Sequence, residues 1–420
     1  MSKNEPIRGT KDYLPREMAL REKVKSTILK TYKSFGYLQI GTPVLEDIDR
    51  LLGSDGGDNL KLIYKVLKRG EKLDLSKQNL TERDIVDIGL KYDQTVPLVR
   101  MYSNNQNELP NPFKSIQIDY SFRADRPQLG RARQFVQCDI DILGDATNSA
   151  EIDIINTTAK TYSALGLKNI TAKINDRRIL SDLIKNLGFA NEEEKEICIC
   201  LDKLDKIGES GVLAELIERG FNEAKSTRLC NIIAEIKEAG NDFDAVLTNY
   251  GVRVEVIESV KQVISGANVL SDGNFKAVFD ISIVRGQNYY TGAVYEFYIE
   301  GMNGACAGGG RYDNMVEKMT GKAVPAVGLG LGFEPTCILV IQQGLVKVDE
   351  KTIAVLYKPE QNYVEAMQLV QKLNKTANAG AIQIKKNLNH QLELLKANGY
   401  THFCYFRENL EANEVEIQEL

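Results

Sequence analysis

The chain has 420 residues, a net charge of −5, two histidines and no tryptophan. An apolar fraction of 43% and a charged fraction of 26% are typical of a globular protein, and they exclude collagen-like and mostly disordered classes. The length predicts two to three domains at about 150 residues each. No apolar stretch is long enough to span a membrane, and Met1-Ser-Lys-Asn-Glu5 does not resemble a secretory signal.

Of the seven cysteines, only Cys198 and Cys200 are close in sequence, and a zinc site would need a second such pair. We therefore expect a reduced, cytoplasmic protein with structural cysteines, no metal bound by the protein itself and no membrane partner. Only His390 and His402 are present, so mechanisms that depend on a catalytic histidine are nearly excluded.

The first elements in chain order are a helix and an extended segment. Apolar residues recur at helical spacing over residues 17–35, which predicts an amphipathic helix. Gly36 ends it, and an extended segment leads to Thr42-Pro43. Residues 51–90 are polar and rich in Gly, Asp and Lys, so we interpret them as a loop-rich insertion.

Two strands with strict alternation follow, over residues 116–122 and 134–142. In the second strand, Val136, Cys138, Ile140 and Ile142 form an apolar face, and Phe135, Gln137, Asp139 and Asp141 form the opposite face. The short connection predicts an antiparallel pair, which argues against a doubly wound parallel sheet.

The remaining chain is predicted to contain a helical segment, further strands and a separate small domain. Residues 150–268 are mostly helical in pattern, and residues 275–345 return to strand-like runs with glycine clusters at 308–310 and 328–332. From about residue 350, strands and helices alternate, which predicts a small parallel α/β domain. This domain has an excess of Lys and Arg, and the acidic tail after it is predicted to be disordered.

The connection between the two alternating strands carries Arg123, Arg126, Arg131 and Arg133. Four like charges in one hairpin repel one another unless they face an anion. Planar guanidinium groups suit phosphate, so we interpret this loop as a polyphosphate or nucleic-acid contact. The alternative is a solvated loop.

Three further segments allow two interpretations each. The run from Arg285 to Gly292 fits either a site for a small polar substrate or a strand end with a turn. The glycine clusters permit either close approach of a ligand to the backbone or packing of a helix against a strand. Asp93 and Thr95 either share one face of a strand or lie in a turn before a helix that starts near Val96.

Together these segments resemble the histidyl-tRNA synthetase family of class II aminoacyl-tRNA synthetases. The run from Phe122 to Gln137 is similar to motif 2 of that family. Val284–Gly292 is similar to the first histidine-specific segment of the family, and Ala307–Asp313 is similar to the second. Further matches over nearly the whole chain are Arg8-Gly-Thr-Lys-Asp12, Pro43 of motif 1, Tyr92-Asp-Gln-Thr95, Asn175-Asp-Arg177 and Leu201–Lys206.

The resemblance implies an α+β class II core, that is, an antiparallel sheet flanked by helices. Residues 1–165 and 271–345 would form the catalytic core, 166–270 a mostly helical insertion, and 350–420 a shortened anticodon-binding type of α/β domain. The implied reaction is ATP-dependent activation of histidine and its transfer to tRNA(His), with Mg²⁺ accompanying ATP. A homodimer is also implied.

The resemblance assigns roles to particular residues. Arg123 and Arg285 would act on the α-phosphate as the catalytic residues. The ATP-binding residues would be Arg123, Asp125, Arg131, Arg133, Phe135 and Glu334. The residues around the substrate histidine would be Asp93, Thr95, Gln137, Asp141, Arg285, Tyr289, Tyr290 and Tyr312.

Two positions depart from the family pattern. Pro335 stands where motif 3 has an arginine after its acidic residue, and Asn288 stands where the family commonly has aspartate. A proline at that position restricts Glu334 and removes a donor from an expected helix. The alternatives are a non-catalytic relative of the type that regulates ATP phosphoribosyltransferase, and an enzyme that transfers activated histidine to another acceptor.

Overall fold

A computed structural model describes residues 4–53, 57–127, 131–284, 290–347, 351–408 and 414–420. Contacts within the chain divide it into two units. One unit comprises residues 1–10 and 27–342, and the other comprises residues 11–26 and 343–420. Among the described residues, no helix combines the length and the apolar character that crossing a membrane requires.

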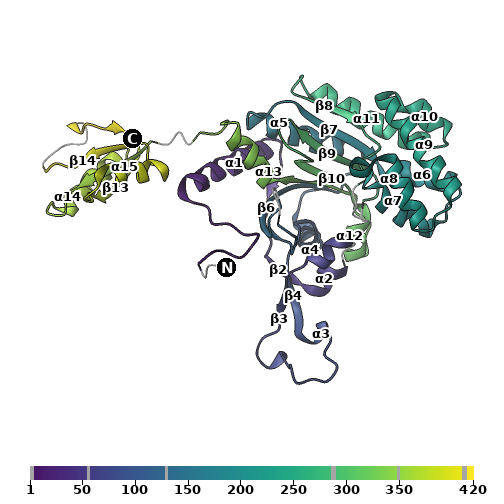
Figure 1. The fold of residues 1–420 in the computed structure, drawn as a ribbon, viewed down its shortest axis with the longest axis horizontal. Helices are drawn as coiled ribbons and strands as arrows, with labels where there is room; N and C mark the ends of the chain where they lie inside the picture. Colours follow the sequence, from purple (N-terminus) through teal and green to yellow (C-terminus); the bar gives the residue numbers. More distant parts are fainter. Residues whose placement is uncertain (1–3, 54–56, 128–130, 285–289, 348–350, 409–413) are drawn as a thin grey trace. The chain divides into compact units, whose positions relative to one another are not determined.

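The larger unit is built around an eight-stranded sheet in the order β1-β5-β6-β11-β10-β9-β7-β8 (Figure 1). Its strands are β1 (Leu38–Gln39), β5 (Phe113–Phe122), β6 (Gln134–Leu143), β7 (Ile170–Asp176), β8 (Phe275–Phe279), β9 (Ala293–Ile299), β10 (Ala307–Arg311) and β11 (Ala326–Gly332). The strands from β5 to β7 pair antiparallel, and only the two edge pairs, β1–β5 and β7–β8, are parallel. The predicted antiparallel α+β core is confirmed.

The hairpin β5–β6 has the two faces that the alternation predicts. Cys138 and Ile140 are fully buried on the apolar face. Helices α5 (Ser149–Ala164) and α13 (Phe333–Gln342) contact β6. One face of the sheet is therefore covered, which leaves the polar face of β6 to line a site.

The helical segment is shorter than predicted. Strand β7 lies inside the range 166–270, where the pattern indicated helices, and it pairs with β9 and β8 in the core sheet. The helices follow it: α6 (Arg177–Asn186), α7 (Glu194–Leu201), α8 (Leu204–Glu218), α9 (Glu223–Ala239), α10 (Phe243–Asn249) and α11 (Val254–Leu270). Asp176 ends the strand and caps α6 by accepting a hydrogen bond from the Arg178 amide. A single strand of seven residues between helices is too short for its apolar alternation to stand out.

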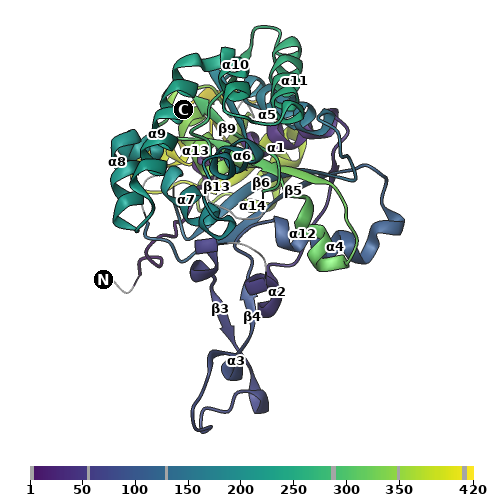
Figure 2. The same ribbon diagram turned by 90° about the vertical axis from the view of Figure 1, so that its right-hand side faces the viewer.

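Residues 51–90 form more regular structure than the predicted loop. They contain the second half of α2 (Ile48–Gly53), then β3 (Lys65–Leu67), α3 (Glu82–Ile85) and β4 (Val86–Leu90). β4 pairs with both β3 and β2 (Leu45–Asp47) in a three-stranded sheet. This hairpin extends away from the eight-stranded sheet as an arm in both views (Figures 1 and 2). It leads directly into α4 (Thr95–Asn105), and α12 (Asp313–Thr320) contacts α4.

The C-terminal part of the second unit is the predicted small α/β domain. Its elements are β12 (Thr352–Tyr357), α14 (Tyr363–Leu373), β13 (Asn378–Gln383), α15 (Leu388–Ala397), β14 (His402–Tyr405) and β15 (Gln418–Glu419). β12 pairs parallel with β13 and β14, as predicted. This unit also includes the first part of α1 (Pro15–Ser34), the helix predicted over 17–35.

The acidic tail is not disordered at its end, contrary to the prediction. Gln418 and Glu419 pair antiparallel with β14. Val415 and Ile417 pack against one apolar cluster of the domain, and Leu420 packs against another. Charge composition alone missed these three apolar residues, which dock the tail beside an otherwise unpaired strand edge.

Candidate active site

A cavity of about 540 Å³ opens on the polar face of the sheet in the larger unit. β6, β11 and β10 supply its floor, and the segment before α4 and the start of α13 supply its walls. The cavity brings together residues that are far apart in the sequence. The predicted site residues that line it are Asp93, Thr95, Arg123, Asp125, Arg131, Phe135, Gln137, Asp141, Tyr290, Tyr312 and Glu334.

Glycines on β11 keep the floor of the cavity open. Gly328, Gly330 and Gly332 pair across the sheet with Asp141, Asp139 and Gln137, respectively. A Cβ atom on Gly330 would lie 3.0 Å from Oδ1 of Asp139, and one on Gly328 would overlap Oδ1 of Asp141. Any side chain on this face of β11 would therefore occupy the space over the β6 carboxylates. At Gly328 and Gly330 the missing side chains thus leave room for these carboxylates and for a ligand over them. A Cβ atom on Gly309 would instead overlap the backbone oxygen of Gly328, so the 308–310 cluster serves close packing between neighbouring strands.

Three buried aspartates, Asp93, Asp139 and Asp141, line one part of the cavity, and each is less than one-tenth exposed. Burial raises the pKa of Asp141 to about 7, although the hydrogen bond from Tyr312 lowers it. Burial also raises the pKa of Asp93, and the nearby Arg123 lowers it. Burial raises the pKa of Asp139 well above its usual range, and Asp141 and Asp93 raise it further. A cation bound among them would relieve this repulsion.

Two buried acceptors on β6 have no hydrogen-bond partner within the described part of the chain. Oε1 of Gln137 and Oδ1 of Asp139 make no hydrogen bond with the described residues. Buried polar atoms are almost always hydrogen-bonded, so an unsatisfied acceptor in a cavity points to a donor on a ligand. The site is thus suited to a small molecule that carries positive charge and N–H groups.

Tyr312 orients the carboxylate of Asp141. Its hydroxyl donates a 2.6 Å hydrogen bond to Oδ1 of Asp141. The preceding residue, Arg311, forms a bidentate ion pair with the buried Glu151, at 2.6 and 2.7 Å. Arg311 also donates to the backbone oxygens of Asp145 and Thr147. These bonds hold β10 against the start of α5, so the Tyr312 ring has a defined position.

Arg123 joins the aspartates to an aromatic wall. Its Nε donates a 2.9 Å hydrogen bond to the backbone oxygen of Tyr92, next to Asp93. Its Cζ lies 5.2 Å from the centre of the Phe135 ring, which is a cation–π arrangement. The Arg123 guanidinium is therefore held in a fixed position near the aspartates. A ligand could place an anionic group on Arg123 and a cationic group on the aspartates.

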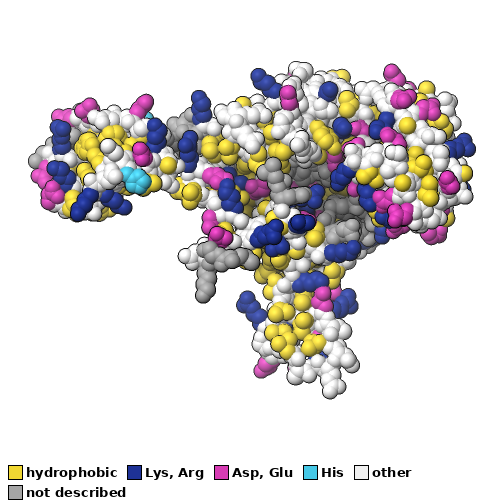
Figure 3. Space-filling view, viewed as in Figure 1, with side chains coloured by type: hydrophobic (Ala, Val, Ile, Leu, Met, Phe, Trp, Pro, Cys, Tyr) yellow, Lys and Arg dark blue, Asp and Glu magenta, His cyan; other side chains and the backbone are white. Residues whose placement is uncertain are grey.

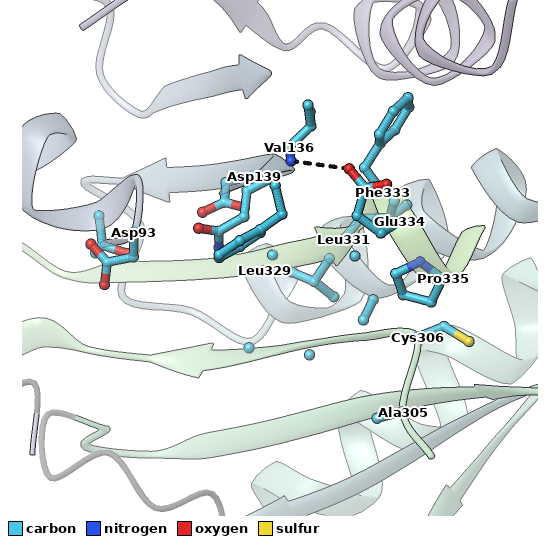
Figure 4. A pocket seen from close by; sticks show the side chains of 18 of the residues that line it. Asp93, Val136, Asp139, Ala305, Cys306, Leu329, Leu331, Phe333, Glu334 and Pro335 are labelled. Atoms are coloured by element: carbon cyan, nitrogen blue, oxygen red, sulfur yellow. Dashed lines mark hydrogen bonds between the residues drawn. The ribbon is translucent and has the colours of Figure 1, made fainter. Parts of the chain in front are cut away.

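The opposite end of the cavity is formed by the start of α13. Figure 4 shows Glu334, Pro335 and Cys306 at one end and Asp93 at the other, with Asp139 on the Asp93 side. Oε1 of Glu334 accepts a 3.4 Å hydrogen bond from the Val136 amide. This bond ties α13 to the strand that carries Phe135.

Comparisons with known proteins identify the family of the chain. The family model described as histidyl-tRNA synthetase matches residues 9–335. The chain belongs to the histidyl-tRNA synthetase family. A histidine–tRNA ligase of Leifsonia xyli subsp. xyli is 36% identical over 425 residues, which cover 99% of this chain and 98% of that protein. The histidine–tRNA ligase of Nanoarchaeum equitans is 35% identical over 374 residues, covering 88% of this chain and 82% of that protein.

Solved structures share the fold. A histidyl-tRNA synthetase from Nostoc sp. PCC 7120 superposes with a TM-score of 0.76 at 24% identity, covering 99% of this chain and 96% of that one. A Bacillus halodurans protein, described as an ATP phosphoribosyltransferase regulatory subunit/histidyl-tRNA synthetase, also has a TM-score of 0.76, at 17% identity, covering 96% of this chain and 98% of that one.

The remaining predicted residues of this family member lie elsewhere or outside the described ranges. Arg133 does not line the cavity. Its Nε donates to the backbone oxygen of Asp125, and its amide donates to the backbone oxygen of Gly9. Arg133 thus shapes the motif 2 loop against the N-terminal segment. Arg285 and Tyr289 lie outside the described residues, as does Asn288.

Asp93 and Thr95 settle one of the open alternatives. They do not share a strand, because Thr95 is the first residue of α4 and Asp93 precedes it in the connection from β4. Oδ1 of Asp93 accepts a 3.4 Å hydrogen bond from the Val96 amide at the start of the helix. The turn interpretation is therefore confirmed, and both residues nevertheless line the cavity.

Pro335 does not disrupt the motif 3 helix. It is the third residue of α13, after Phe333 and Glu334. The first amides of a helix have no partner within it, so a proline in the first turn removes no hydrogen bond. The sequence argument treated the position as helix interior. The structural cost of proline here is small, and what differs from the family pattern is the missing guanidinium.

Asp139 is the cavity residue that the role assignments missed. The alternation of β6 already placed it on the polar face with Gln137 and Asp141. Its contribution became apparent only when β11 and Asp93 enclosed that face.

Proposed function

We propose that this protein is a histidine–tRNA ligase, which activates histidine with ATP and transfers it to tRNA(His). The observation that carries the proposal is one cavity with two chemically different ends. Arg123, Phe135 and Glu334 suit a nucleotide, and the buried carboxylates with Gln137 suit a small cationic substrate. Membership of the family gives the reaction that joins two such ligands.

The first step forms histidyl-adenylate. A carboxylate oxygen of histidine attacks the α-phosphorus of ATP, a new oxygen–phosphorus bond forms, and pyrophosphate leaves. Negative charge grows on the α-phosphate oxygens as this happens. Arg123, already oriented by Tyr92 and Phe135, supplies fixed positive charge there. Arg285 is proposed to approach the same phosphate from another side.

The nucleotide is proposed to contact the motif 2 loop and motif 3. Phe135 would stack on adenine, and Asp125, Arg131 and Arg133 would act from the loop, with Arg133 in a supporting position. Mg²⁺ takes oxygen ligands and is commonly held by one or two carboxylates with substrate phosphates. The Glu334 carboxylate, which lines the cavity, fits that role. When bound, Mg²⁺ would neutralise phosphate charge.

The amino acid is proposed to lie over β6 and β11. Asp141, held by Tyr312, would accept a hydrogen bond from the imidazole N–H. Asp93, Thr95 and Gln137 would surround the amino-acid end. Tyr289 and Tyr290 are also proposed to lie around the substrate histidine. In the second step, a terminal ribose hydroxyl of tRNA attacks the carbonyl carbon, the new ester forms, and AMP leaves.

Further parts of the molecule are proposed to serve tRNA and assembly. The α/β domain of residues 350–420 is proposed to contact the anticodon region, because its folded part, residues 351–407, has an excess of Lys and Arg, which attracts phosphate. A cytoplasmic homodimer is proposed from the family. Leu67, Leu75 and Leu80 on the arm are exposed, at 53%, 65% and 39%, and Figure 3 shows hydrophobic side chains there between basic ones. Such a surface is suited to a partner subunit.

The second candidate is a regulatory relative without catalysis. Its support is the missing arginine at Pro335. Transfer of histidine to another acceptor is a third candidate.

The deciding experiment is histidine-dependent exchange of pyrophosphate into ATP, followed by charging of tRNA(His). The ligase requires both activities. No exchange with histidine would favour the regulatory relative, whereas exchange without charging would favour another acceptor. The other proteinogenic amino acids serve as controls for specificity.

A further inference from the structure

Asp139 is a buried carboxyl with no established task. It lies between Gln137 and Asp141 on β6, about 6.6 Å along the strand from each. It is 6% exposed, and it lines the cavity. Its Oδ1 makes no hydrogen bond with the described residues. Because this unsatisfied acceptor belongs to a residue that lines the cavity, a donor on a bound ligand can complete it.

The surroundings of Asp139 favour a ligand over a structural partner. Gly330 lies opposite it on β11, and a Cβ atom there would lie 3.0 Å from Oδ1 of Asp139. The absence of a side chain at Gly330 thus preserves space beside this oxygen. Within the described ranges, no cluster of three or more His, Cys, Asp or Glu side chains is arranged to hold a metal ion.

The charges around Asp139 have a definite order. Burial raises the pKa of Asp139 most, and the charges of Asp141 and Asp93 raise it further. Arg123 and the buried Lys91 lower it. Arg123 also lowers the pKa of Asp93, which burial raises. Its Nε donates a hydrogen bond to the backbone oxygen of Tyr92, the residue before Asp93. Asp93, Asp139 and Arg123 line the same cavity, and Figure 4 shows Asp139 on the Asp93 side of it, so two carboxyl groups lie near one guanidinium. Asp141 has a separate role at the Tyr312 hydroxyl.

An α-amino acid presents an ammonium and a carboxylate on one carbon, which match a carboxyl pair next to an arginine. Resting on the proposed function, we propose that Asp139 binds the α-ammonium group of the substrate amino acid together with Asp93. The imidazole ring then extends toward Asp141 and Tyr312. Asp139 is thus a specificity-determining residue that requires the substrate to carry a free amino group.

The test compares binding of three ligands to the full chain by isothermal titration calorimetry. Histidine and histidinol both carry the ammonium and the ring, whereas imidazolepropionate carries the ring without the ammonium. Asp139→Asn should weaken histidine and histidinol by about 10- to 100-fold, the size expected for loss of a charge-assisted hydrogen bond. It should leave the affinity for imidazolepropionate and the KM for ATP within about twofold, because neither interaction depends on the ammonium.

The matched control is Asp87→Asn, which removes a carboxylate from β4 outside the cavity. It should leave all three affinities unchanged. The melting temperature of each variant is measured alongside. Asp139→Asn should not lower it, since the substitution keeps the shape of the side chain and removes repulsion among buried carboxylates.

Two outcomes overturn the inference. Unchanged histidine affinity would show that Asp139 does not contact the substrate, and an equal loss for all three ligands would show that it acts on the ring or on the fold. Failure of the proposed function is recognised separately, because the unsubstituted chain would then show no histidine-dependent pyrophosphate exchange.

Discussion

Gly328 on β11 lies directly across the sheet from Asp141 on β6, and only the absence of a side chain at Gly328 leaves room for the Asp141 carboxylate. The same carboxylate accepts a 2.6 Å hydrogen bond from Tyr312. The substrate end of the cavity therefore depends on a glycine that contributes space and a tyrosine that contributes orientation.

Gly328→Ala should reduce histidine binding strongly. The new methyl group would overlap Oδ1 of Asp141, so either the carboxylate or the strand must shift. We expect a KM for histidine at least about tenfold higher and a loss of about 1–3 kcal/mol in the free energy of unfolding. Pyrophosphate exchange and denaturant unfolding measure these effects. Gly41→Ala is the control, because a Cβ atom there meets nothing within 4 Å.

The KM for histidine should depend on pH near 7. The pKa of Asp141 is raised by burial to about 7, so its carboxyl is mostly neutral below that pH and charged above it. A carboxylate binds a cationic or N–H-donating substrate better, so the KM should rise as the pH falls through about 7. A KM that is constant across this range would show that Asp141 does not titrate in the free site.

Tyr312→Phe should shift that pH dependence upward. The Tyr312 hydrogen bond lowers the pKa of Asp141, and its loss raises that pKa further. The transition in KM should therefore occur at higher pH than in the unsubstituted protein. Tyr405→Phe, at an exposed tyrosine of the C-terminal domain, should leave the profile unchanged.

Arg123→Lys should lower kcat for pyrophosphate exchange more than it raises the KM for histidine. Lysine keeps the charge but loses the planar group that bonds to Tyr92 and lies near Phe135. Loss of preorganised charge at a transition state costs about 10²–10³ in rate. A matched control is Arg83→Lys in an exposed ion pair with Asp49. A change in KM alone would assign Arg123 to ground-state binding.

Pro335→Arg should be tolerated structurally and should lower the KM for ATP. The position lies in the first turn of α13, where both residues are compatible with the helix, and it lines the cavity next to Glu334. An added guanidinium would contact phosphate oxygens. The readout is the KM for ATP in pyrophosphate exchange. An unchanged KM would mean that other cations already hold the distal phosphates.

The sequence by itself determined the family, the antiparallel pair β5–β6 and most of the polar and charged residues that line the cavity. These features rest on local signals, because strand alternation separates two faces of β6, and the motif 2 run is contiguous. Pattern also sufficed for the C-terminal α/β domain, whose strands and helices each carry a clear period.

Only the tertiary structure decided which of these residues act together. β7 was hidden in a helical range because its strand character depends on pairing with β9 and β8. The tail strand β15 needed the free edge of β14. The significance of Asp139 and Pro335 was likewise not local. A carboxylate becomes a ligand only when glycines and a distant turn enclose it, and a proline is harmless or harmful according to its place in a helix. Pairing register and enclosure are properties of segments far apart in the chain, and no local pattern encodes them.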